Sequence, residues 1–320
     1  MKTFEHIPQL DLSPLWDDSD DGLERVANIV KDIYTTVGFS YLINYQIPKE
    51  VTESIYLASK RFHALPLDVK MKIKQNRFFR GYVPVEVSNE AGKHGNQNEA
   101  FVITYEVPED HPDYKNGTYM AGPNQWPEGL PDFKETVICY RDHMLKLAKK
   151  LVAVFSIALG LGPNGLDKYF YNPTYVLRLQ CYPKQLKKIP DNLYGLAPHT
   201  DYGLFTILSQ ASGEGLEVES INGEWLSVPY VPNTLVLNSG DTLKRLSNNT
   251  FRSNPHRVVN RSTKERLSIP FFFEPDMHSI IEVLPNYISE DHPPQYSPIK
   301  YGDYLVDRLQ GDFGPLSKLG

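Results

Sequence analysis

The chain has 320 residues, of which 41% are hydrophobic and 22% are charged. This composition excludes gross disorder and is sufficient for a buried core. The formal net charge of −6 at pH 7 gives no indication of a basic surface for nucleic acid or anionic lipid. Two cysteines, Cys139 and Cys181, are too few for a disulfide framework or a cysteine-based zinc site.

Targeting and membrane signals are weak along the chain. The N-terminal stretch has no apolar h-region of the kind that a signal peptide needs. The longest apolar run, residues 151–161, is shorter than the roughly 20 residues that span a bilayer. We therefore expect a cytoplasmic protein, monomeric by default, that acts on a small molecule and has neither nucleic acid nor membrane as a partner.

The first half of the chain predicts mainly helices. Apolar residues from Leu23 to Val37 follow one helical face, and Gly38 stands where a helix C-cap belongs. Residues 78–122 are rich in Gly, Pro and Asn and predict loops with short strands, as in a lid or pocket wall. The further elements expected in this half are strands over 7–12 and 39–45 and helices over 50–65 and 131–161.

The pattern changes after about residue 175. Short runs rich in β-branched and aromatic residues follow one another, with turn residues between them. Such spacing, with few helices, is typical of an antiparallel sandwich or barrel. The runs are YVLRLQCY, LFTILSQ, GLEVES, EWLSVPY, TLVLNSGD, HRVVN, RLSIPFFFEP and SIIEVLP.

One histidine–carboxylate pair stands at the start of a predicted strand. His199 and Asp201 are two residues apart, so their side chains leave the chain on the same side and can reach one ion. His256 begins another predicted strand and supplies a candidate third ligand. Two histidines and a carboxylate with open positions suit non-haem Fe(II), whereas a structural zinc site would have four protein ligands. A second His-x-Asp pair, at residues 111–113, lies in a loop with no strand after it and is expected to be unrelated to a metal.

A candidate anion-binding group follows His256. Arg266, Ser268 and Phe272 would share one face of a strand. A guanidinium beside a hydroxyl is well suited to gripping a carboxylate inside a barrel.

These residues carry a resemblance that extends from residue 7 to about 275. The stretches IPQLDLS, GFSYLINYQIP, HTDYG, GEWLSVPYVPNTLVLNSGD, LSNNTFRSNPHRVV and RLSIPFFFEP are similar to the Fe(II)/2-oxoglutarate-dependent dioxygenases of the isopenicillin-N-synthase-like group. The resemblance implies a mixed α+β fold with a double-stranded β-helix (jelly-roll) core, flanked by helices mainly from the N-terminal half. It implies one unit over 1–320, made of an N-terminal region (1–120), a supporting helix and connection (121–174), the jelly-roll core (175–285) and a C-terminal tail (286–320).

The resemblance also implies a chemistry and its residues. His199, Asp201 and His256 would bind Fe(II), while Arg266 and Ser268 would hold the distal carboxylate of 2-oxoglutarate. Tyr182 would contact the same cosubstrate, and Gln180 stands where the family usually has Asn. The expected reaction couples oxidative decarboxylation of 2-oxoglutarate by O2 to C–H oxidation of a small organic metabolite, as in secondary metabolism, with ascorbate as an optional reductant.

Alternatives remain open at this point. A same-fold Fe(II) oxidase without 2-oxoglutarate, a non-redox metal-binding jelly roll and a zinc hydrolase would each use a similar ligand set. Phe272 is a candidate substrate contact from the inner face of its strand, and Phe101 and Tyr105 are candidates for the pocket entrance. Arg178 could meet an acidic substrate or form a salt bridge.

Overall fold

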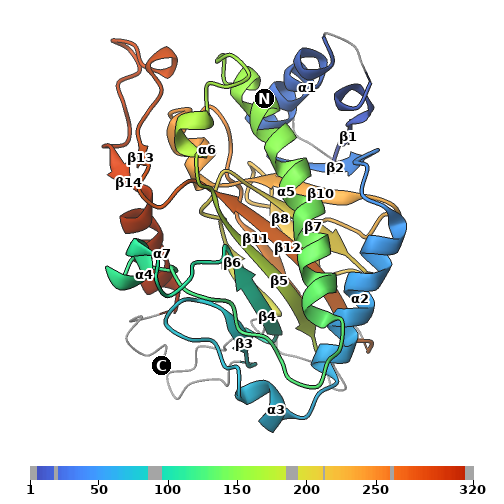
Figure 1. The fold of residues 1–320 in the computed structure, drawn as a ribbon. Coiled ribbons are helices and arrows are strands. Elements are labelled where there is room, and N and C mark those ends of the chain that lie inside the picture. The colour runs from blue at the N-terminus through green and yellow to red at the C-terminus, as the bar shows by residue number, and fades with distance from the viewer. Residues whose placement is uncertain are drawn as a thin grey trace.

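Two main sheets form the core of the protein. The computed structural model describes residues 6–17, 21–85, 96–184, 194–211, 213–259 and 263–313. The larger sheet has eight strands in the order β1-β2-β10-β7-β12-β5-β4-β3, and the smaller has four in the order β6-β11-β8-β9. All described pairings in both sheets are antiparallel except that of β1 with β2. A third, two-stranded sheet, β13-β14, lies near the C-terminal end (Figure 1).

Most of the strands come from the second half of the chain, as the spacing of the β-rich runs predicts. The strands are β1 (Gln9–Asp11), β2 (Phe39–Ile43), β3 (Gly81–Val83), β4 (Glu99–Thr104), β5 (Thr174–Tyr182), β6 (Leu196–His199), β7 (Phe205–Gln210), β8 (Leu216–Glu219), β9 (Trp225–Ser227), β10 (Leu235–Ser239), β11 (His256–Val258), β12 (Arg266–Glu274), β13 (Ile280–Ile281) and β14 (Ile299–Lys300). The α-helices are α1 (Gly22–Thr36), α2 (Lys49–His63), α3 (Leu67–Met71), α4 (Pro112–Lys115), α5 (Phe133–Ala158), α6 (Asp241–Leu246) and α7 (Tyr301–Phe313). Short 3-10 turns occupy Ser13–Leu15, Asp167–Tyr169 and Pro285–Tyr287.

A layer of helices covers the large sheet on the side away from the small one. α5 packs against both α1 and α2 and crosses the sheet in Figure 1. Its Phe155 stacks on Phe205 of β7, with 5.3 Å between ring centroids. The same ring meets Tyr34 of α1 edge to face at 5.1 Å. Aromatic contacts of this kind join the helical layer to the core strands.

The long N-terminal helices and the glycine between the first helix and strand agree with the sequence prediction. Gly38 has a φ of +74°, and its N–H donates to Ile33 O at 3.1 Å, as in a helix C-cap. A side chain at this position would also collide with the amide oxygen of Asn254, two residues before His256. The turn that starts β2 is thus tied to the segment that leads into β11.

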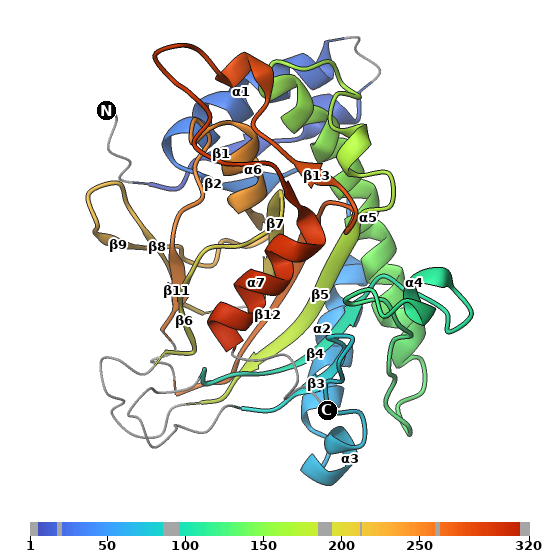
Figure 2. The same ribbon diagram turned by 90° about the vertical axis from the view of Figure 1, so that its left-hand side faces the viewer.

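The C-terminal part differs from a simple tail. α7 runs beside β12 and β5 in Figure 2, and its Leu305 and Leu309 share a cavity with residues of those strands. The spacing of these two leucines is helical, although this segment was expected to be a C-terminal tail with no assigned helix. Packing against the core therefore stabilises a helix that the local sequence alone did not predict.

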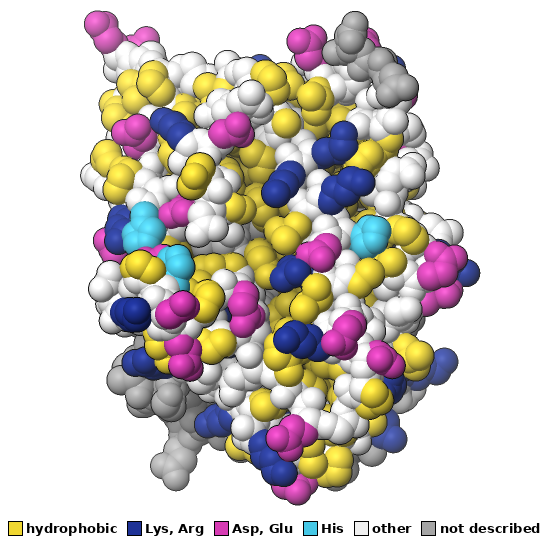
Figure 3. Space-filling view, viewed as in Figure 1, with side chains coloured by type: hydrophobic (Ala, Val, Ile, Leu, Met, Phe, Trp, Pro, Cys, Tyr) yellow, Lys and Arg dark blue, Asp and Glu magenta, His cyan; other side chains and the backbone are white. Residues whose placement is uncertain are grey.

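The surface carries both charge signs. On the face shown in Figure 3, acidic and basic side chains are interspersed, with hydrophobic groups between them. This pattern agrees with the modest net charge of the chain. Within the described part of the chain, none of the helices combines the length and the apolar character required to traverse a bilayer.

Phe101 is a core residue and not part of the pocket entrance, so this expectation was wrong. Its ring lies 4.9 Å from Phe62 and 5.1 Å from Phe133, and its exposure is zero. The neighbouring Val102 lines the main cavity instead. Because side chains alternate along a strand, a shift of one position moves a residue to the other face.

Phe101→Ala should therefore lower the free energy of unfolding by about 3–5 kcal/mol, the usual cost of removing a buried aromatic ring. Urea unfolding measures this loss, and Tyr171→Ala, at a ring that is 92% exposed, is the matched control. A wild-type stability for Phe101→Ala would contradict the core assignment.

Candidate active site

Strand pairing brings the two predicted histidines together. His199 ends β6 and His256 begins β11, and the two residues are direct partners in the antiparallel register. Their ring centroids are 4.3 Å apart. Asp201 follows β6 by two residues and lies opposite both rings. One nitrogen of each histidine and one oxygen of Asp201 lie within 4.8 Å of one another, so all three can reach a common ion.

Backbone carbonyls orient both imidazoles. His199 Nδ1–H donates to Ala197 O at 2.8 Å, and His256 Nδ1–H donates to Asn254 O at 3.2 Å. A carbonyl can only accept, so each Nδ1 carries the proton and each Nε2 keeps its lone pair. This is how histidine ligands of a metal are usually held.

The carboxylate of Asp201 is held by one oxygen. Its Oδ2 accepts hydrogen bonds from Thr206 Oγ1 and from Asn238 Nδ2, the latter at 2.7 Å. The other oxygen, Oδ1, lies 3.6 Å from Nε2 of each histidine. The side chain is only 3% exposed. A single oxygen is therefore directed at the space between the two rings.

The protonation states favour a divalent cation. Burial lowers the pKa of His256 to about 4, against the opposing effect of the Asp201 carboxylate. Burial acts to raise the pKa of Asp201, but the two histidines and the Thr206 hydroxyl hold it below its ordinary value. At neutral pH the carboxylate is charged and the His256 ring is neutral, which are the forms that bind metals.

A buried guanidinium lies in the same part of the fold. Arg266 is 2% exposed, and its Nη2 donates to Gln210 Oε1 at 2.9 Å. Its Nε and Nη1 have no hydrogen-bond partner among the described residues. The guanidinium carbon lies 4.9 Å from the ring centroid of Tyr182, its partner on β5. A buried cation with unsatisfied donors is a site for an anion such as a carboxylate.

Two adjoining cavities connect these groups. The inner one lies between the sheets and is lined by all six residues predicted to hold the metal or the cosubstrate, together with Phe272. Those six are Tyr182, His199, Asp201, His256, Arg266 and Ser268. The outer cavity has a volume of about 320 Å³ and shares Gln180, His199, Asp201 and Phe272 with the inner one. The inner cavity has a volume of only about 40 Å³, so an ion, an anion beside Arg266 and a second small molecule would have to share the two cavities.

The C-terminal helix is fastened to the metal-binding segment. Asp241 Oδ2 accepts from Arg308 Nη1 of α7 at 2.5 Å and from Tyr304 OH at 3.0 Å. The same oxygen accepts from Thr200 Oγ1 at 3.0 Å. Because Thr200 lies between the two residues of the His-x-Asp pair, α7 and the ligand segment share one anchoring carboxylate.

Other expected positions fall outside the cavities. Tyr105 follows β4 and lies against Arg80, whose guanidinium carbon is 6.0 Å from its ring, and it does not line the outer cavity itself. The second His-x-Asp pair opens α4, where His111 Nδ1 accepts from the Asp113 N–H at 3.1 Å. That pair forms an ordinary exposed helix cap.

Several cavity residues were not singled out from the sequence. Tyr202 directly follows Asp201, and Glu274 lies two residues beyond Phe272, on the same face of β12. Burial raises the pKa of Glu274 to about 8, and the Asp201 carboxylate adds to this effect. The strand alternation that placed Phe272 inward could have identified Glu274. Leu305 and Leu309 of α7 also line the cavity, but only the three-dimensional structure places them there.

Comparisons with known proteins agree with this geometry. Residues 7–129 match the non-haem dioxygenase N-terminal family named for morphine synthesis, and residues 173–275 match the 2OG-Fe(II) oxygenase superfamily. The 2-oxoglutarate-Fe(II) type oxidoreductase hxnY of Emericella nidulans is 35% identical, covering 96% of this chain and 90% of its own. Homoarginine-6-hydroxylase 2-ODD-C23.1 of Arabidopsis thaliana is 30% identical, over 97% of this chain and 98% of its own.

Solved structures lead to the same group. A full-length Neurospora crassa protein, crystallised in complex with alpha-KG and thymine, superposes with a TM-score of 0.83 at 29% identity, covering 96% of this chain and 97% of its own. The mixed α+β fold with a jelly-roll core is thereby confirmed. Iron and 2-oxoglutarate are the cofactor and the cosubstrate of these relatives, and the alternatives without 2-oxoglutarate are not supported. The chain belongs to the 2OG-Fe(II) oxygenase superfamily and is an Fe(II)/2-oxoglutarate-dependent dioxygenase that oxidises a small metabolite.

Proposed function

We propose that His199, Asp201 and His256 hold the iron and that the adjoining outer cavity binds a small, planar heterocycle rich in hydrogen-bond acceptors. The two Nε2 atoms and Asp201 Oδ1 support the ligand assignment, because each directs a lone pair at the same space. Bound iron, together with 2-oxoglutarate, supplies the activation of O2 and the oxidation of a substrate C–H bond.

Arg266 is the proposed anchor of the distal carboxylate of 2-oxoglutarate. Its Nε and Nη1 have no partner among the described residues, so the guanidinium keeps N–H donors for the oxygens of a carboxylate. Ser268 lines the same cavity two residues further along β12, and Tyr182 lies beneath the guanidinium. A cosubstrate anchored here would extend from the inner cavity toward the iron ligands, and the substrate would occupy the rest of the outer cavity.

The outer cavity supports a substrate of limited size. Its volume of about 320 Å³ lies at the small end of the range for ligand pockets. Tyr202 and Phe272 supply aromatic faces, and Arg178 supplies a positive charge. Together with the iron ligands, these groups would orient a flat ring and exclude water from it.

The charges in the cavity favour acceptor groups on the substrate. Arg178 is cationic, while Glu274, with a pKa of about 8, is largely a neutral hydrogen-bond donor at neutral pH. An oxo or carboxylate oxygen fits such a lining better than a guanidinium does. The Neurospora crassa structures with thymine and with 5-formyluracil are the neighbours whose bound molecules have this character. The homoarginine hydroxylases are relatives whose substrate carries a guanidinium besides its carboxylate.

The cytoplasmic location and the monomeric state expected from the sequence stay predictions. Two free cysteines, Cys139 and Cys181, agree with a reducing compartment.

Asn238→Ala should weaken Fe(II) binding by about 10–100-fold, the usual effect of removing a group that orients a metal ligand. The variant loses one of the two donors, Asn238 and Thr206, that hold Asp201 Oδ2 and leave Oδ1 facing the histidines. Anaerobic Fe(II) titration measures the affinity, with Asn222→Ala at an exposed turn as the control. An unchanged Fe(II) affinity would contradict the proposal that Asn238 orients the Asp201 carboxylate for metal binding.

Arg266→Gln should weaken 2-oxoglutarate binding by about 100-fold, since a buried carboxylate loses its charged partner. Calorimetry on protein loaded with Mn(II) reports the affinity directly. Arg257→Gln serves as the control, because Arg257 is on β11 and pairs with Glu217 at 2.6 Å. A change of less than twofold for Arg266→Gln would show that the anchor lies elsewhere.

A substrate panel tests the proposed substrate class. Oxo- or carboxylate-bearing heterocycles, thymine among them, should stimulate O2 uptake and succinate formation more than homoarginine does. Arg178→Met should weaken binding of the best heterocycle at least tenfold, because the acceptor loses its charged donor. Its affinity for 2-oxoglutarate should be unchanged. Preference for homoarginine would overturn the substrate class while leaving the iron and 2-oxoglutarate assignments intact.

A further inference from the structure

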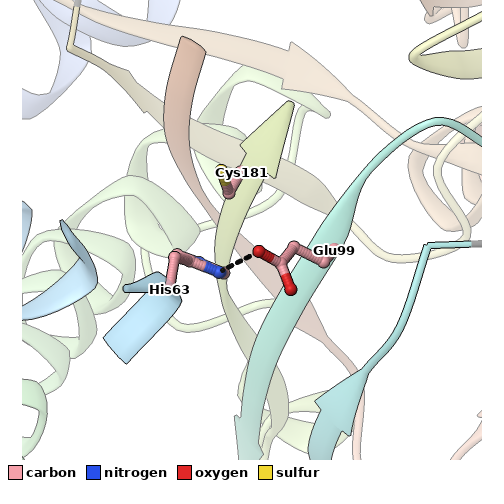
Figure 4. Close-up of side chains that lie close together, drawn as sticks. All are labelled: His63, Glu99 and Cys181. Atoms are coloured by element: carbon pink, nitrogen blue, oxygen red, sulfur yellow. Dashed lines mark ion pairs between the residues drawn. The ribbon is translucent and has the colours of Figure 1, made fainter. Parts of the chain in front are cut away.

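A second group of potential metal ligands lies on the opposite face of β5 from the iron site. It consists of His63 at the end of α2, Glu99 at the start of β4 and Cys181 on β5, shown in Figure 4. Glu99 and Cys181 are direct partners across the two strands. One ligand atom of each residue lies within 4.8 Å of the other two. The group is buried, with the His63 side chain 3% exposed and that of Glu99 13% exposed.

His63 turns a nitrogen lone pair into this group. Its Nε2 lies 3.0 Å from Leu179 O, and because a carbonyl only accepts, Nε2 carries a proton. Nδ1 lies 3.3 Å from Glu99 Oε1 and has no hydrogen-bond partner among the described residues. In the neutral ring, Nδ1 therefore directs a lone pair at a carboxylate oxygen, an arrangement that a cation between the two atoms would stabilise.

The spacing suits a tetrahedral ion. Zinc binds histidine nitrogen and carboxylate oxygen at about 2.0–2.1 Å, so two such ligands at a tetrahedral angle are about 3.3 Å apart. This is the distance between His63 Nδ1 and Glu99 Oε1. Cys181 is 2% exposed and adds a sulfur ligand from β5.

The carboxylate is ionised and already oriented. Glu99 Oε2 accepts from Lys70 Nζ at 2.7 Å and from Tyr82 OH at 2.5 Å, which leaves Oε1 for a further partner. Burial acts to raise the pKa of Glu99, but its contacts with His63, Lys70 and Tyr82 lower it to about 2. A divalent cation would be neutralised by this carboxylate and a Cys181 thiolate, so Lys70 could keep its own contact with Oε2.

We propose that His63, Glu99 and Cys181 form a second metal site, which binds a borderline divalent cation of the zinc type through Nδ1, Oε1 and Sγ. The Cys181 thiol loses its proton to solvent when the ion binds, and water completes the tetrahedron. Mixed nitrogen, oxygen and sulfur ligands favour zinc over magnesium or calcium. Two cysteines are too few for a zinc site built mainly from cysteines, but a site with mixed ligands needs only one.

The position gives the site a structural consequence. Gln180 and Tyr182 flank Cys181 and project from the other face of β5, into the inner cavity. An ion at Cys181 would fix β5 directly behind these residues. The second site would thus support the wall of the 2-oxoglutarate pocket without contacting the reacting atoms.

Cobalt(II) titration of the full chain tests this proposal. Cobalt replaces zinc in such sites, and a bound thiolate gives a near-ultraviolet sulfur-to-cobalt charge-transfer absorption. The iron site has no sulfur ligand, so cobalt bound there does not produce this absorption. With a phosphine as the reductant, wild-type protein should develop the absorption to one equivalent.

Variants assign the absorption to a residue. Cys139→Ser, at the exposed and only other cysteine, should keep it, whereas Cys181→Ser should abolish it. His63→Ala should weaken cobalt binding at this site at least tenfold. No absorption in wild-type protein, or loss of the absorption in Cys139→Ser, would overturn the proposal. Because the chain has two cysteines, the Cys139→Ser result decides the question even if Cys181→Ser does not fold.

Discussion

The pairing of His199 with His256 across β6 and β11 is the constraint on which the active site depends. It places two imidazoles side by side, and the Nδ1–H group of each donates to the backbone carbonyl two residues earlier in the chain. Asp201 completes the group because Thr206 and Asn238 hold one of its oxygens and leave the other facing the rings. Rotation of any one of these side chains would leave a buried polar atom without a partner, so the backbone and its hydrogen bonds fix the donor set before a metal arrives.

The strand β5 links the functions of the two cavities. Its inward side chains include Arg178 in the outer cavity, Gln180 between the cavities and Tyr182 beneath Arg266. Its outward side chains meet α2 and β4, where His63 and Glu99 surround Cys181. A single strand thus carries groups proposed to contact substrate, cosubstrate and a second metal ion, and alternation along the strand keeps these groups on separate faces.

Local sequence patterns predicted the parts of the site that depend on neighbours in the chain. The His-x-Asp pair, the strand after it and the alternation from Arg266 to Phe272 are all short-range features, and the structure brings these residues to one cavity. Phe101 was expected at the entrance although it faces the core, because the pairing of β4 with β5, and not the residues of β4 alone, decides which side chains of β4 face inward.

Features that depend on contacts between distant segments could not be predicted from the sequence. α7 owes its position to Asp241, which binds both Arg308 and the Thr200 hydroxyl. The group around Cys181 needs three elements, α2, β4 and β5, to meet at one point. Neither arrangement produces a recognisable spacing in the sequence, because its residues are far apart along the chain. His199 and Asp201, in contrast, are two residues apart at the end of one strand and form a recognisable motif.

The most direct test of the account is a crystal structure grown without oxygen in the presence of Fe(II) and 2-oxoglutarate. The account predicts one iron bonded to Nε2 of His199, Nε2 of His256 and Oδ1 of Asp201 at about 2.0–2.2 Å. The carboxylate of 2-oxoglutarate remote from the metal should contact the guanidinium of Arg266. Iron bound away from these three atoms, or a cosubstrate whose far carboxylate does not meet that guanidinium, would contradict it.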